Sequence, residues 1–422
     1  MNVVTVGGCL PYPANTGGRL RTLNLLVRLA RRHRITYLAT RNPDRAEASA
    51  ALAYLADHGI EPVEIEHTVL RKSGPRFYAR LAANLASTLP YSVASHHAPA
   101  INAEVARRAK TAKVDVWQAE WAGGMEAFRG LPDTSRTVVI APNVETLIWE
   151  RYAETETQPL RRLYIRKQAR KFARYERDVW RHAGRVVAVT REDAALMTGR
   201  FGVPAERIDV VDNGLDRGFY ETVSRSHDHD PARILFLGSL DWRPNLDAVS
   251  LLLDRLFPAV REAVPNATLE IVGRNPPASL AAKAEATPGV SLHANVPDVR
   301  PFLARAGVMA VPLRVGGGSR LKILEALGSG VPVVSSAVGM EGLALRPGVD
   351  LSVVDDATMM ADALIDAVRR PGVHQSMAAT ARPRVLAQYD WDALADALEE
   401  SWLRCAGRSG SSRHKDASLA AV

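Results

Sequence analysis

Residues 311–334 read V-P-L-R-V-G-G-G-S-R-L-K-I-L-E-A-L-G-S-G-V-P-V-V, and this stretch decides the fold class. An apolar strand runs into three consecutive glycines, a helix opens with Ser319, Arg320 and Lys322, and a second apolar strand follows. Glycines let backbone amides approach a ligand closely, and the helix start adds the positive end of its dipole. Cations are unfavourable there unless an anion meets them, so the pattern predicts a diphosphate site; the alternative is a tight turn with a solvated basic first turn. Glu325, one turn beyond Lys322, adds an acceptor suited to sugar hydroxyls.

The length and composition indicate a globular protein of two domains. The chain has 422 residues, which is long for a single domain, and 47% hydrophobic and 24% charged residues are typical of globular proteins. Cys9 and Cys405 provide neither a disulfide framework nor a metal-ligand spacing, so we expect a cytoplasmic location. The N-terminus lacks a basic region before its apolar residues, and no apolar run approaches the thickness of a bilayer. Export and membrane insertion are therefore not expected.

The formal net charge of +8 favours an anionic partner. Nucleic acid is disfavoured, because the sequence has no recognised motif and no aromatic–basic stacking platform. A phosphorylated small molecule or an anionic membrane face fits better. Residues 161–181, R-R-L-Y-I-R-K-Q-A-R-K-F-A-R-Y-E-R-D-V-W-R, predict an amphipathic basic helix that could lie on acidic lipid headgroups. A solvated helix that packs its apolar stripe inward is the slightly favoured alternative.

Short apolar strands alternate with helical stretches along the chain, which predicts parallel sheets covered by helices on both faces. Two such sheets are expected, so we predict an α/β protein of two Rossmann-like, doubly wound domains. The H-D-H-D run at 227–230 has no further ligands nearby and is expected to be solvated rather than a metal site. The predicted parts are an N-terminal domain over 1–215, a linker over 216–232, a C-terminal domain over 233–384, a helix over 385–405 that crosses back to the first domain, and a flexible tail over 406–422.

Further motifs stand in a fixed order around the glycine stretch. They are P-Y-P-A-N-T-G-G-R-L-R-T-L-N-L-L from Pro11, V-V-D-N-G-L-D from Val210, F-L-G-S-L-D-W-R-P-N-L-D-A from Phe236, I-V-G-R-N-P from Ile271, V-P-D-V-R-P-F-L from Val296 and G-G-G-S-R-L-K-I-L-E-A-L from Gly316. Each piece is weak alone, and six in order are specific. Together they resemble a GT-B glycosyltransferase of family four, the glycosyl transferases group 1, in a bacterial subgroup found in polysaccharide and secondary-metabolite clusters. The resemblance covers roughly residues 1–400.

The resemblance implies a fold, a reaction and a division of labour. It implies two Rossmann-like domains that face each other across a cleft, with a nucleotide-diphosphate sugar in the second domain and the acceptor in the first. It implies a transferase of the hexosyltransferase type that retains the anomeric configuration. The nucleotide-sugar is a substrate, and no cofactor is expected.

The chain departs from the family pattern at three positions. The usual pair of glutamates seven residues apart would stand at 317 and 325, and Gly317 replaces the first of them. The common lysine beside the first phosphate-binding loop of the second domain is absent, and Arg243 is the nearest cation. Glu120 stands where many relatives have a histidine. We keep Glu120 as a candidate catalytic residue.

Charge grows on the diphosphate as it leaves, so the protein must stabilise that charge. No convincing acidic pair stands at a strand end to hold a metal, and Lys322 and Arg243, with Arg320 and the helix start, could act without one. Gly17, Gly18 and Arg19 follow the first strand, where open α/β sheets bind ligands, with a plain turn as the alternative. The resemblance implies that the loops at residues 273–274 and 296–298 surround the nucleotide base. It also implies that Glu325 accepts hydrogen bonds from the ribose hydroxyls. The predicted donor-binding residues are Gly17, Gly18, Arg19, Gly238, Arg243, Gly273, Arg274, Val296, Asp298, Gly317, Gly318, Ser319, Arg320, Leu321, Lys322 and Glu325.

Acceptor residues are expected at strand ends of the first domain. Glu120 and Trp121 end one strand, and Asn143 and Glu145 follow another. Residues 96–97, a pair of histidines in a helical region, are expected at the surface or in the core rather than at the catalytic centre.

The resulting prediction is a retaining, metal-independent glycosyltransferase. It would move a sugar to a hydroxyl or amine of a small-molecule, glycan or lipid-linked acceptor, first of all in cell-surface polysaccharide or glycoconjugate synthesis. Glycosylation of a natural product or aminoglycoside is the alternative by the same chemistry. Three other classes remain: an epimerase acting on a nucleotide-sugar, a membrane-surface module, and a catalytically silent partner subunit, which the replacement at Gly317 favours.

Overall fold

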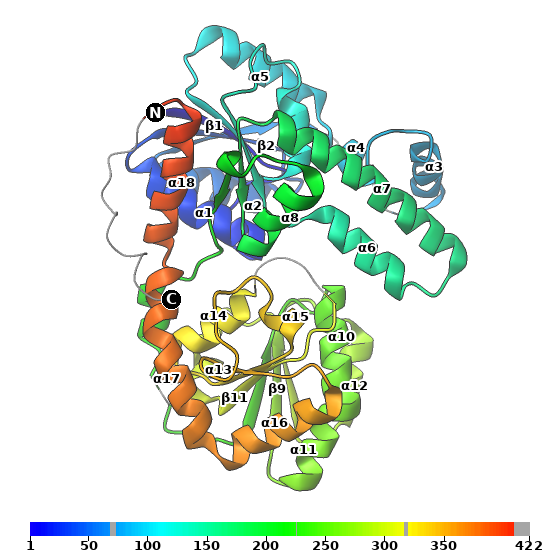
Figure 1. Ribbon diagram of the computed structural model, residues 1–422, viewed down its shortest axis with the longest axis vertical. Helices are drawn as coiled ribbons and strands as arrows, with labels where there is room; N and C mark the ends of the chain where they lie inside the picture. The colour runs from blue at the N-terminus through cyan, green and yellow to red at the C-terminus, as the bar shows by residue number, and fades with distance from the viewer. Residues whose placement is uncertain (68–72, 225, 316–319, 409–422) are drawn as a thin grey trace. The chain divides into compact units, whose positions relative to one another are not determined.

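The chain divides into two compact units in a computed structural model that describes residues 1–67, 73–224, 226–315 and 320–408 (Figure 1). The first unit comprises Met1–Val211 and Leu394–Val422, and the second comprises Asp212–Ala393. Each unit contains a parallel sheet with helices on both faces. The two predicted parallel sheets of an α/β protein are therefore confirmed.

The first unit is built on a seven-stranded parallel sheet in the order β3-β2-β1-β4-β5-β6-β7. Its strands are β1 (Asn2–Val6), β2 (Arg34–Thr40), β3 (Ile60–Ile65), β4 (Val116–Ala119), β5 (Thr137–Ala141), β6 (Arg185–Ala188) and β7 (Ile208–Val210). Its helices are α1 (Gly17–Ala30), α2 (Arg45–Asp57), α3 (Pro75–Asn84), α4 (Tyr91–His96), α5 (Pro99–Thr111), η1 (Ala122–Phe128), α6 (Glu145–Thr155), α7 (Pro159–His182), α8 (Arg191–Phe201) and η2 (Ala205–Arg207). Strand order reverses between β1 and β4, and open α/β sheets bind ligands beyond the strand ends at such a point.

The second unit has a six-stranded parallel sheet in the order β10-β9-β8-β11-β12-β13. Its strands are β8 (Arg233–Leu237), β9 (Thr268–Gly273), β10 (Val290–Ala294), β11 (Val308–Val311), β12 (Val333–Ser335) and β13 (Ser352–Val353). Its helices are α9 (Arg217–Glu221), α10 (Arg243–Leu251), η3 (Leu252–Leu256), α11 (Phe257–Ala263), α12 (Ala278–Ala286), α13 (Arg300–Arg305), α14 (Leu321–Gly328), α15 (Ala337–Met340), α16 (Ala357–Arg369) and α17 (Pro371–Gln388). The order reverses here between β8 and β11.

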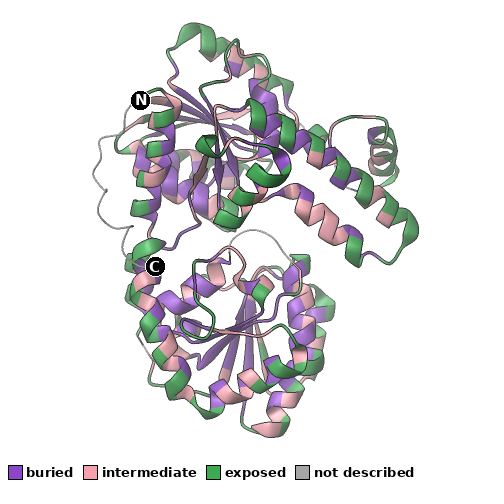
Figure 2. Cartoon of the chain, in the orientation of Figure 1, coloured by how far each residue is buried: buried purple, intermediate pink, exposed green. Residues whose placement is uncertain are grey.

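Burial explains why these segments form strands. Figure 2 shows the strands of both sheets as mostly buried, and β5, T-V-V-I-A, is buried at every position. Continuous runs of β-branched residues suit strands covered on both faces. N-cap side chains also stabilise the starts of helices. The Thr16 side chain accepts from the Arg19 amide at the start of α1, and the Asp44 side chain accepts from the Ala46 and Glu47 amides at the start of α2.

Helix α18 (Trp391–Cys405) packs mostly on the first unit. The indole of Trp402 is fully buried and donates to Gln118 Oε1 at 2.6 Å, and Glu399 Oε1 lies 2.6 Å from His33 Nε2. The segment expected as one helix over 385–405 is broken after α17. Tyr389 lies between α17 and α18, and its carbonyl accepts from the Leu215 amide at 2.8 Å.

The segment expected as a polar linker, 216–232, contains α9 and contributes to the core of the second unit. Tyr220 and Val223 are both buried in that core. The contacts place the division between the units at Val211 and Asp212. None of the helices in the described parts of the chain combines the length and the apolar character needed to cross a bilayer.

Candidate functional site

A cavity of about 220 Å³ lies in the second unit, where β8 and β11 end on either side of the reversal in strand order. It is the place that the topology of the sheet assigns to a ligand. The end of β8 and the residues that follow it form one part of the wall. Arg320 and Lys322, at the start of α14, supply the cations. The cavity is lined by Leu237, Gly238, Ser239, Trp242, Pro244, Asn245, Leu313, Arg320, Leu321, Lys322 and Glu325.

Lys322 is the best-defined cation of this cavity. Its Nζ donates to Asn245 Oδ1 at 2.8 Å and lies 4.4 Å from the centroid of the Phe236 ring. Burial, and after it the charge of Arg320, lowers the pKa of Lys322 to about 7. The amine is therefore held with little compensation for its charge, and an anion in the cavity would supply that compensation.

Two further features bring charge and backbone close to Lys322. Arg320 immediately precedes α14, its side chain is 6% exposed, and its Nε donates to the Val338 carbonyl at 3.1 Å. A Cβ on Gly238 would lie 2.9 Å from Lys322 Nζ, so only glycine leaves the amine in its present place. The turn after β8 thus requires the residue that lets the backbone approach a ligand.

Glu325 shares the cavity and is already held by a hydroxyl. Its Oε1 accepts from the Tyr220 hydroxyl at 2.8 Å, and burial raises the pKa of the Glu325 carboxyl. Tyr220 comes from α9, and burial followed by the charge of Glu325 raises the pKa of its phenol. No motif of the sequence marks Tyr220 as part of this site.

The structure gathers part of the predicted donor set in this cavity. Gly238, Arg320, Leu321, Lys322 and Glu325 all line it. Gly317, Gly318 and Ser319 lie outside the described residues.

The other donor candidates of the second unit lie beside the cavity rather than among the described residues that line it. Arg243 begins α10, next to the lining residue Trp242, and is exposed. Arg274 Nε donates to Ser239 Oγ at 2.8 Å, so it reaches the wall of the cavity through that serine. Gly273 ends β9, where a Cβ would lie 2.0 Å from the Gly238 carbonyl oxygen.

Val296 and Asp298 follow β10 in the same unit. Asp298 forms an ion pair with Arg300 at 2.8 Å, and hydrogen bonding to this guanidinium lowers the pKa of Asp298. Arg300 in turn lies over the Phe219 ring, 3.9 Å from its centroid. Asp298 is therefore engaged by a neighbouring arginine.

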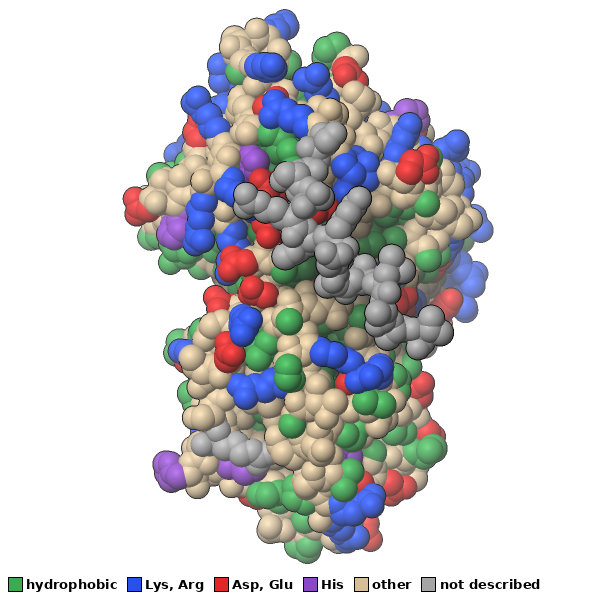
Figure 3. Space-filling view, turned by 60° about the vertical axis from the view of Figure 1, so that its left-hand side comes forward, with side chains coloured by type: hydrophobic (Ala, Val, Ile, Leu, Met, Phe, Trp, Pro, Cys, Tyr) green, Lys and Arg blue, Asp and Glu red, His purple; other side chains and the backbone are tan. Residues whose placement is uncertain are grey.

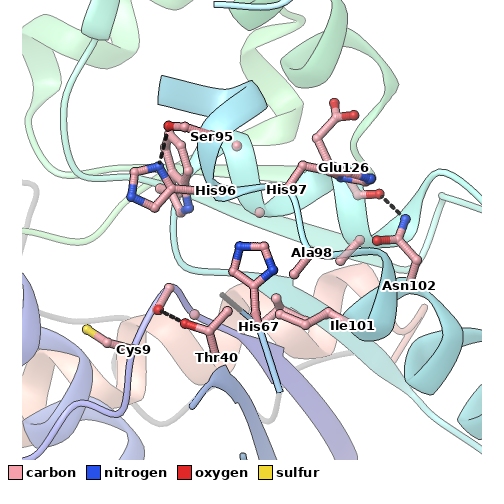
Figure 4. Close-up of a pocket in the computed structure, with 17 residues that line it drawn as sticks. Cys9, Thr40, His67, Ser95, His96, His97, Ala98, Ile101, Asn102 and Glu126 are labelled. Atoms are coloured by element: carbon pink, nitrogen blue, oxygen red, sulfur yellow. Dashed lines mark hydrogen bonds between the residues drawn. The ribbon is translucent and has the colours of Figure 1, made fainter. Parts of the chain in front are cut away.

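A second cavity, of about 310 Å³, lies in the first unit beyond the ends of β1 and β4, again at the reversal of strand order. Figure 4 shows how His67, His96 and His97 lie around it. The His96 ring meets the Trp121 ring edge to face with centroids 5.9 Å apart. The lining consists of Val6, Gly7, Gly8, Cys9, Thr40, His67, Ser95, His96, His97, Ala98, Ile101, Asn102, Trp121, Gly123, Gly124, Glu126 and Ala127.

The lining of this cavity is largely apolar and aromatic, and it contains neither lysine nor arginine among the described residues. A Cβ on Gly123 would lie 2.2 Å from the Trp121 ring, so the glycine makes room for the indole. Thr40 Oγ1 donates to the Gly8 carbonyl at 2.6 Å and joins the ends of neighbouring strands. Such a cavity suits an uncharged group with an apolar face.

Of the predicted acceptor residues, only Trp121 lines this cavity among the described residues. Glu120 belongs to a partly buried network, in which its Oε2 accepts from Thr22 Oγ1 at 2.5 Å and its Oε1 from Gln118 Nε2 at 2.7 Å. Burial raises the pKa of Glu120. Because Gln118 also accepts from Trp402, this carboxyl is positioned by the C-terminal helix.

Asn143 and Glu145 lie together at the start of α6. The Glu145 amide donates to Glu176 Oε1 at 2.8 Å, and Glu176 Oε2 accepts from the Thr146 amide and hydroxyl at 3.0 and 2.5 Å. Burial raises the pKa of Glu145, while a hydrogen bond from Asn143 opposes that rise. The start of α6 is thus held by a buried carboxyl on α7.

Gly17 and Gly18 form the first turn of α1, and Arg19 follows them. Arg19 Nη1 forms an ion pair with Glu47 at 2.9 Å and its Nε lies 3.4 Å from Cys9 Sγ. Cys9 lines the cavity of the first unit, so Arg19 contacts a lining residue without lining the cavity itself. The histidines at 96–97, expected at the surface or in the core, line the cavity as well.

Comparison with known proteins matches both units. Residues 16–214 match the family described as "Glycosyl transferase 4-like domain", and residues 231–370 match "Glycosyl transferases group 1". The glycogen synthase of Mycobacterium tuberculosis is 28% identical over 218 residues, which cover 49% of this chain and 51% of that protein. The D-inositol 3-phosphate glycosyltransferase of Mycobacterium avium is 30% identical over 247 residues, covering 54% of this chain and 57% of that protein. The chain thus matches about half the length of these curated relatives.

Solved structures match over nearly the whole chain. Anabaena HepE in complex with UDP and glucose has a TM-score of 0.65 at 15% identity and covers 95% of this chain and 99% of its own. WaaG, a glycosyltransferase involved in lipopolysaccharide biosynthesis, has a TM-score of 0.63 at 18% identity, covering 94% and 98%. At these identities the likeness concerns the fold, and the predicted GT-B fold is confirmed.

Proposed function

This chain belongs to the glycosyl transferases group 1, family four of the GT-B glycosyltransferases, and from that premise we propose that it transfers a sugar from a nucleotide-diphosphate sugar to an acceptor hydroxyl or amine. One observation carries the proposal. Arg320, Lys322 and Glu325 meet in a single cavity at the point where the second sheet reverses its strand order. Two cations and a helix start match a diphosphate, and the carboxyl matches ribose hydroxyls.

In the proposed reaction, the bond between the anomeric carbon and the diphosphate oxygen breaks while the acceptor oxygen or nitrogen bonds to that carbon. Charge grows on the departing diphosphate, and Lys322 and Arg320 stabilise it. These two cations supply the charge that a metal would otherwise contribute, so the proposed transfer is metal-independent. In a retaining, front-face route the departing phosphate oxygen takes the proton of the acceptor.

We place the acceptor in the cavity of the first unit, against Trp121 and the histidines. Its aromatic and apolar lining supports an acceptor with an uncharged ring at the reacting end. Structures of Anabaena HepE with UDP and with UDP-glucose support a uridine nucleotide as the donor. We propose that the enzyme acts in the cytoplasm in cell-surface polysaccharide or glycoconjugate synthesis, with a natural product or aminoglycoside as the alternative acceptor.

A silent partner subunit is the second candidate, because Gly317 replaces a glutamate of the family pattern. Hydrolysis of the donor separates the two. An enzyme of this type releases sugar from its donor slowly when water replaces the acceptor, whereas a silent subunit binds the donor and leaves it intact.

The donor site is tested by Lys322→Ala. Loss of one charge-assisted contact to the diphosphate should weaken UDP binding by about ten- to a hundredfold, measured by titration calorimetry. The matched control is Lys283→Ala, since Lys283 belongs to the same unit and pairs with Asp254 on the outside.

Circular dichroism of both variants shows whether the fold is kept. UDP affinity that stays unchanged in a folded Lys322→Ala protein would remove the assignment of the donor site. An equal loss in both variants would point to net charge instead of the site.

A further inference from the structure

Helix α7 and the loop that follows α3 enclose a groove of about 680 Å³ in the first unit. The proposed function uses none of it. Six of its residues are lysine or arginine, against one carboxylate, Asp178. We call it the basic groove; it is lined by Leu85, Ser87, Thr88, Leu89, Arg129, Leu163, Arg166, Lys167, Arg170, Lys171, Arg174, Tyr175 and Asp178.

Four of the cations form an exposed stripe along α7. Arg166, Arg170 and Arg174 follow one another at intervals of four residues, and Lys167 stands beside them. No carboxylate in the described parts of the chain forms an ion pair with any of these four. Neighbours of like charge at this spacing repel, so the stripe weakens the helix unless an anion neutralises it.

Other arginines of this chain form ion pairs with carboxylates. Arg107 and Arg108 both pair with Glu104, and Arg200 pairs with Glu150. On the face shown in Figure 3, Lys and Arg side chains are interspersed with Asp and Glu. Unlike these three arginines, the four cations of the stripe have no carboxylate partner in the described parts of the chain.

The wall opposite the stripe is fixed by a buried cation. Lys171 is 7% exposed, and its Nζ donates to the Asn84 and Leu89 carbonyls at 2.5 and 3.3 Å. Gln168 supports the same loop, since its Nε2 donates to Asn84 Oδ1 at 3.0 Å and its Oε1 accepts from the Tyr91 amide at 2.9 Å. The groove is therefore a preformed site.

Large apolar side chains stand exposed beside the cations. Leu85 and Leu163 line the groove, and Leu163 is 65% exposed. Leu160, at the start of the same helix, is 82% exposed. An inorganic anion would make no apolar contact with these leucines, whereas an anion attached to an apolar chain would bury them.

We propose that the basic groove binds the phosphate headgroup of an anionic membrane lipid, with Leu160 and Leu163 entering the apolar layer beside it. Cations near an anionic bilayer and shallow apolar insertion add up to reversible attachment. The inference goes beyond sugar transfer and needs no part of the donor site. A free phosphate compound is the other source of the same anion, and the experiment separates the two.

The test is sedimentation of the whole chain with vesicles of phosphatidylcholine, with and without phosphatidylglycerol, at low and physiological salt. Arg166→Gln/Arg170→Gln should weaken binding to anionic vesicles by about tenfold or more, since each basic residue near the surface contributes strongly. The matched control is Arg177→Gln/Arg181→Gln, which removes the same charge from exposed positions of the same helix that do not line the groove.

An apolar pair completes the design. Leu163→Ser should weaken vesicle binding relative to the wild-type chain. Met359→Ser, at a residue that is 60% exposed in the other unit, should leave vesicle binding unchanged. Equal losses in the two arginine pairs would overturn the proposal in favour of unspecific charge. Equal binding to neutral and anionic vesicles, or displacement from vesicles by low concentrations of inorganic phosphate, would also overturn it.

Donor hydrolysis by the Arg166→Gln/Arg170→Gln variant should stay at the wild-type rate. A failure of vesicle binding therefore leaves the proposed sugar transfer standing, and a failure of sugar transfer leaves the groove standing.

Discussion

Lys322 shows how one side chain can combine an unfavourable resting state with a binding role. Burial removes water from its amine, Arg320 adds a like charge, and a neutral Asn245 is the partner that accepts its hydrogen bond. Such a group gains most when an anion enters. A solvated lysine at the same helix start would gain far less, because water already stabilises its charge.

The pKa of Lys322 predicts proton uptake on donor binding. The pKa of Lys322 is about 7 in this structure, and a bound diphosphate raises it because the protonated amine is favoured beside an anion. UDP affinity should therefore fall as the pH rises above about 7, by up to about tenfold per pH unit. Titration calorimetry in buffers of different protonation enthalpy measures the proton directly.

Lys322→Arg is the control for that titration, because a guanidinium stays charged throughout this range. The arginine variant should bind UDP without proton uptake and without this pH dependence. If wild-type and arginine proteins show the same pH profile, Lys322 is not the group that titrates.

The residues of the donor cavity differ in how well the sequence predicts them. Lys322 and Glu325 stand three residues apart on α14, so their meeting in one cavity follows from helical periodicity, and Arg320 directly precedes that helix. Tyr220 stands 105 residues before the Glu325 that it contacts, and no local pattern announces that pair. Tertiary packing of α9 against α14 decides it.

At the scale of elements, the parallel sheets follow from apolar strands alternating with helices, and residues 161–181 do form part of α7. Residues 96–97, the two histidines expected in a helical region, line the first cavity because that region is not one continuous helix. It breaks into α4 and α5, and Pro90 and Pro99 stand at the starts of these helices. Those prolines were the available signal, since proline favours the first positions of a helix.

Helix α6 offers a second pH-dependent element. Burial raises the pKa of Glu176, which holds the α6 start, from 4.5 to about 8. The folded state then keeps a proton that the unfolded chain loses, so the free energy of unfolding should decrease as the pH rises from about 4.5 to about 8. Glu176→Gln should flatten that dependence and cost about 1–3 kcal/mol, because an amide donor then faces backbone donors.

Urea denaturation at several pH values measures both effects. Glu150→Gln is the matched control, because Glu150 lies on α6 itself but pairs with Arg200 at a more exposed position. A wild-type stability that rises with pH across this range would contradict the assignment of a protonated Glu176.

At the scale of the whole molecule, both sheets reverse their strand order beside a cavity, and the two cavities differ in chemistry. The second unit offers cations and a carboxyl, and the first offers aromatic and apolar surface. This division is consistent with a donor and an acceptor that are recognised separately.

A crossed pair of variants tests that division. Trp121 lines the first cavity and Trp242 the second, so each can be replaced by alanine. Trp121→Ala should raise the KM for the acceptor by about tenfold and leave UDP affinity unchanged, because stacking area is lost on the acceptor side alone. Trp242→Ala should weaken UDP binding and leave the KM for the acceptor unchanged.

Melting temperatures of the two variants show whether the replacements act through stability. The division would fail if both variants weakened UDP binding equally. Transfer assayed with and without a chelator accompanies the experiment, and the proposed role of Arg320 and Lys322 predicts the same rate in both.

The return of α18 to the first unit has a consequence for biosynthesis. A ribosome delivers the chain from its N-terminus, so all seven strands of the first sheet emerge before any part of the second unit. The partners that α18 supplies to His33 and Gln118 emerge only after the second unit. While the second unit is being translated, the nascent first unit therefore lacks α18, which covers part of it in the folded protein. We expect chaperones to bind the first unit during this interval.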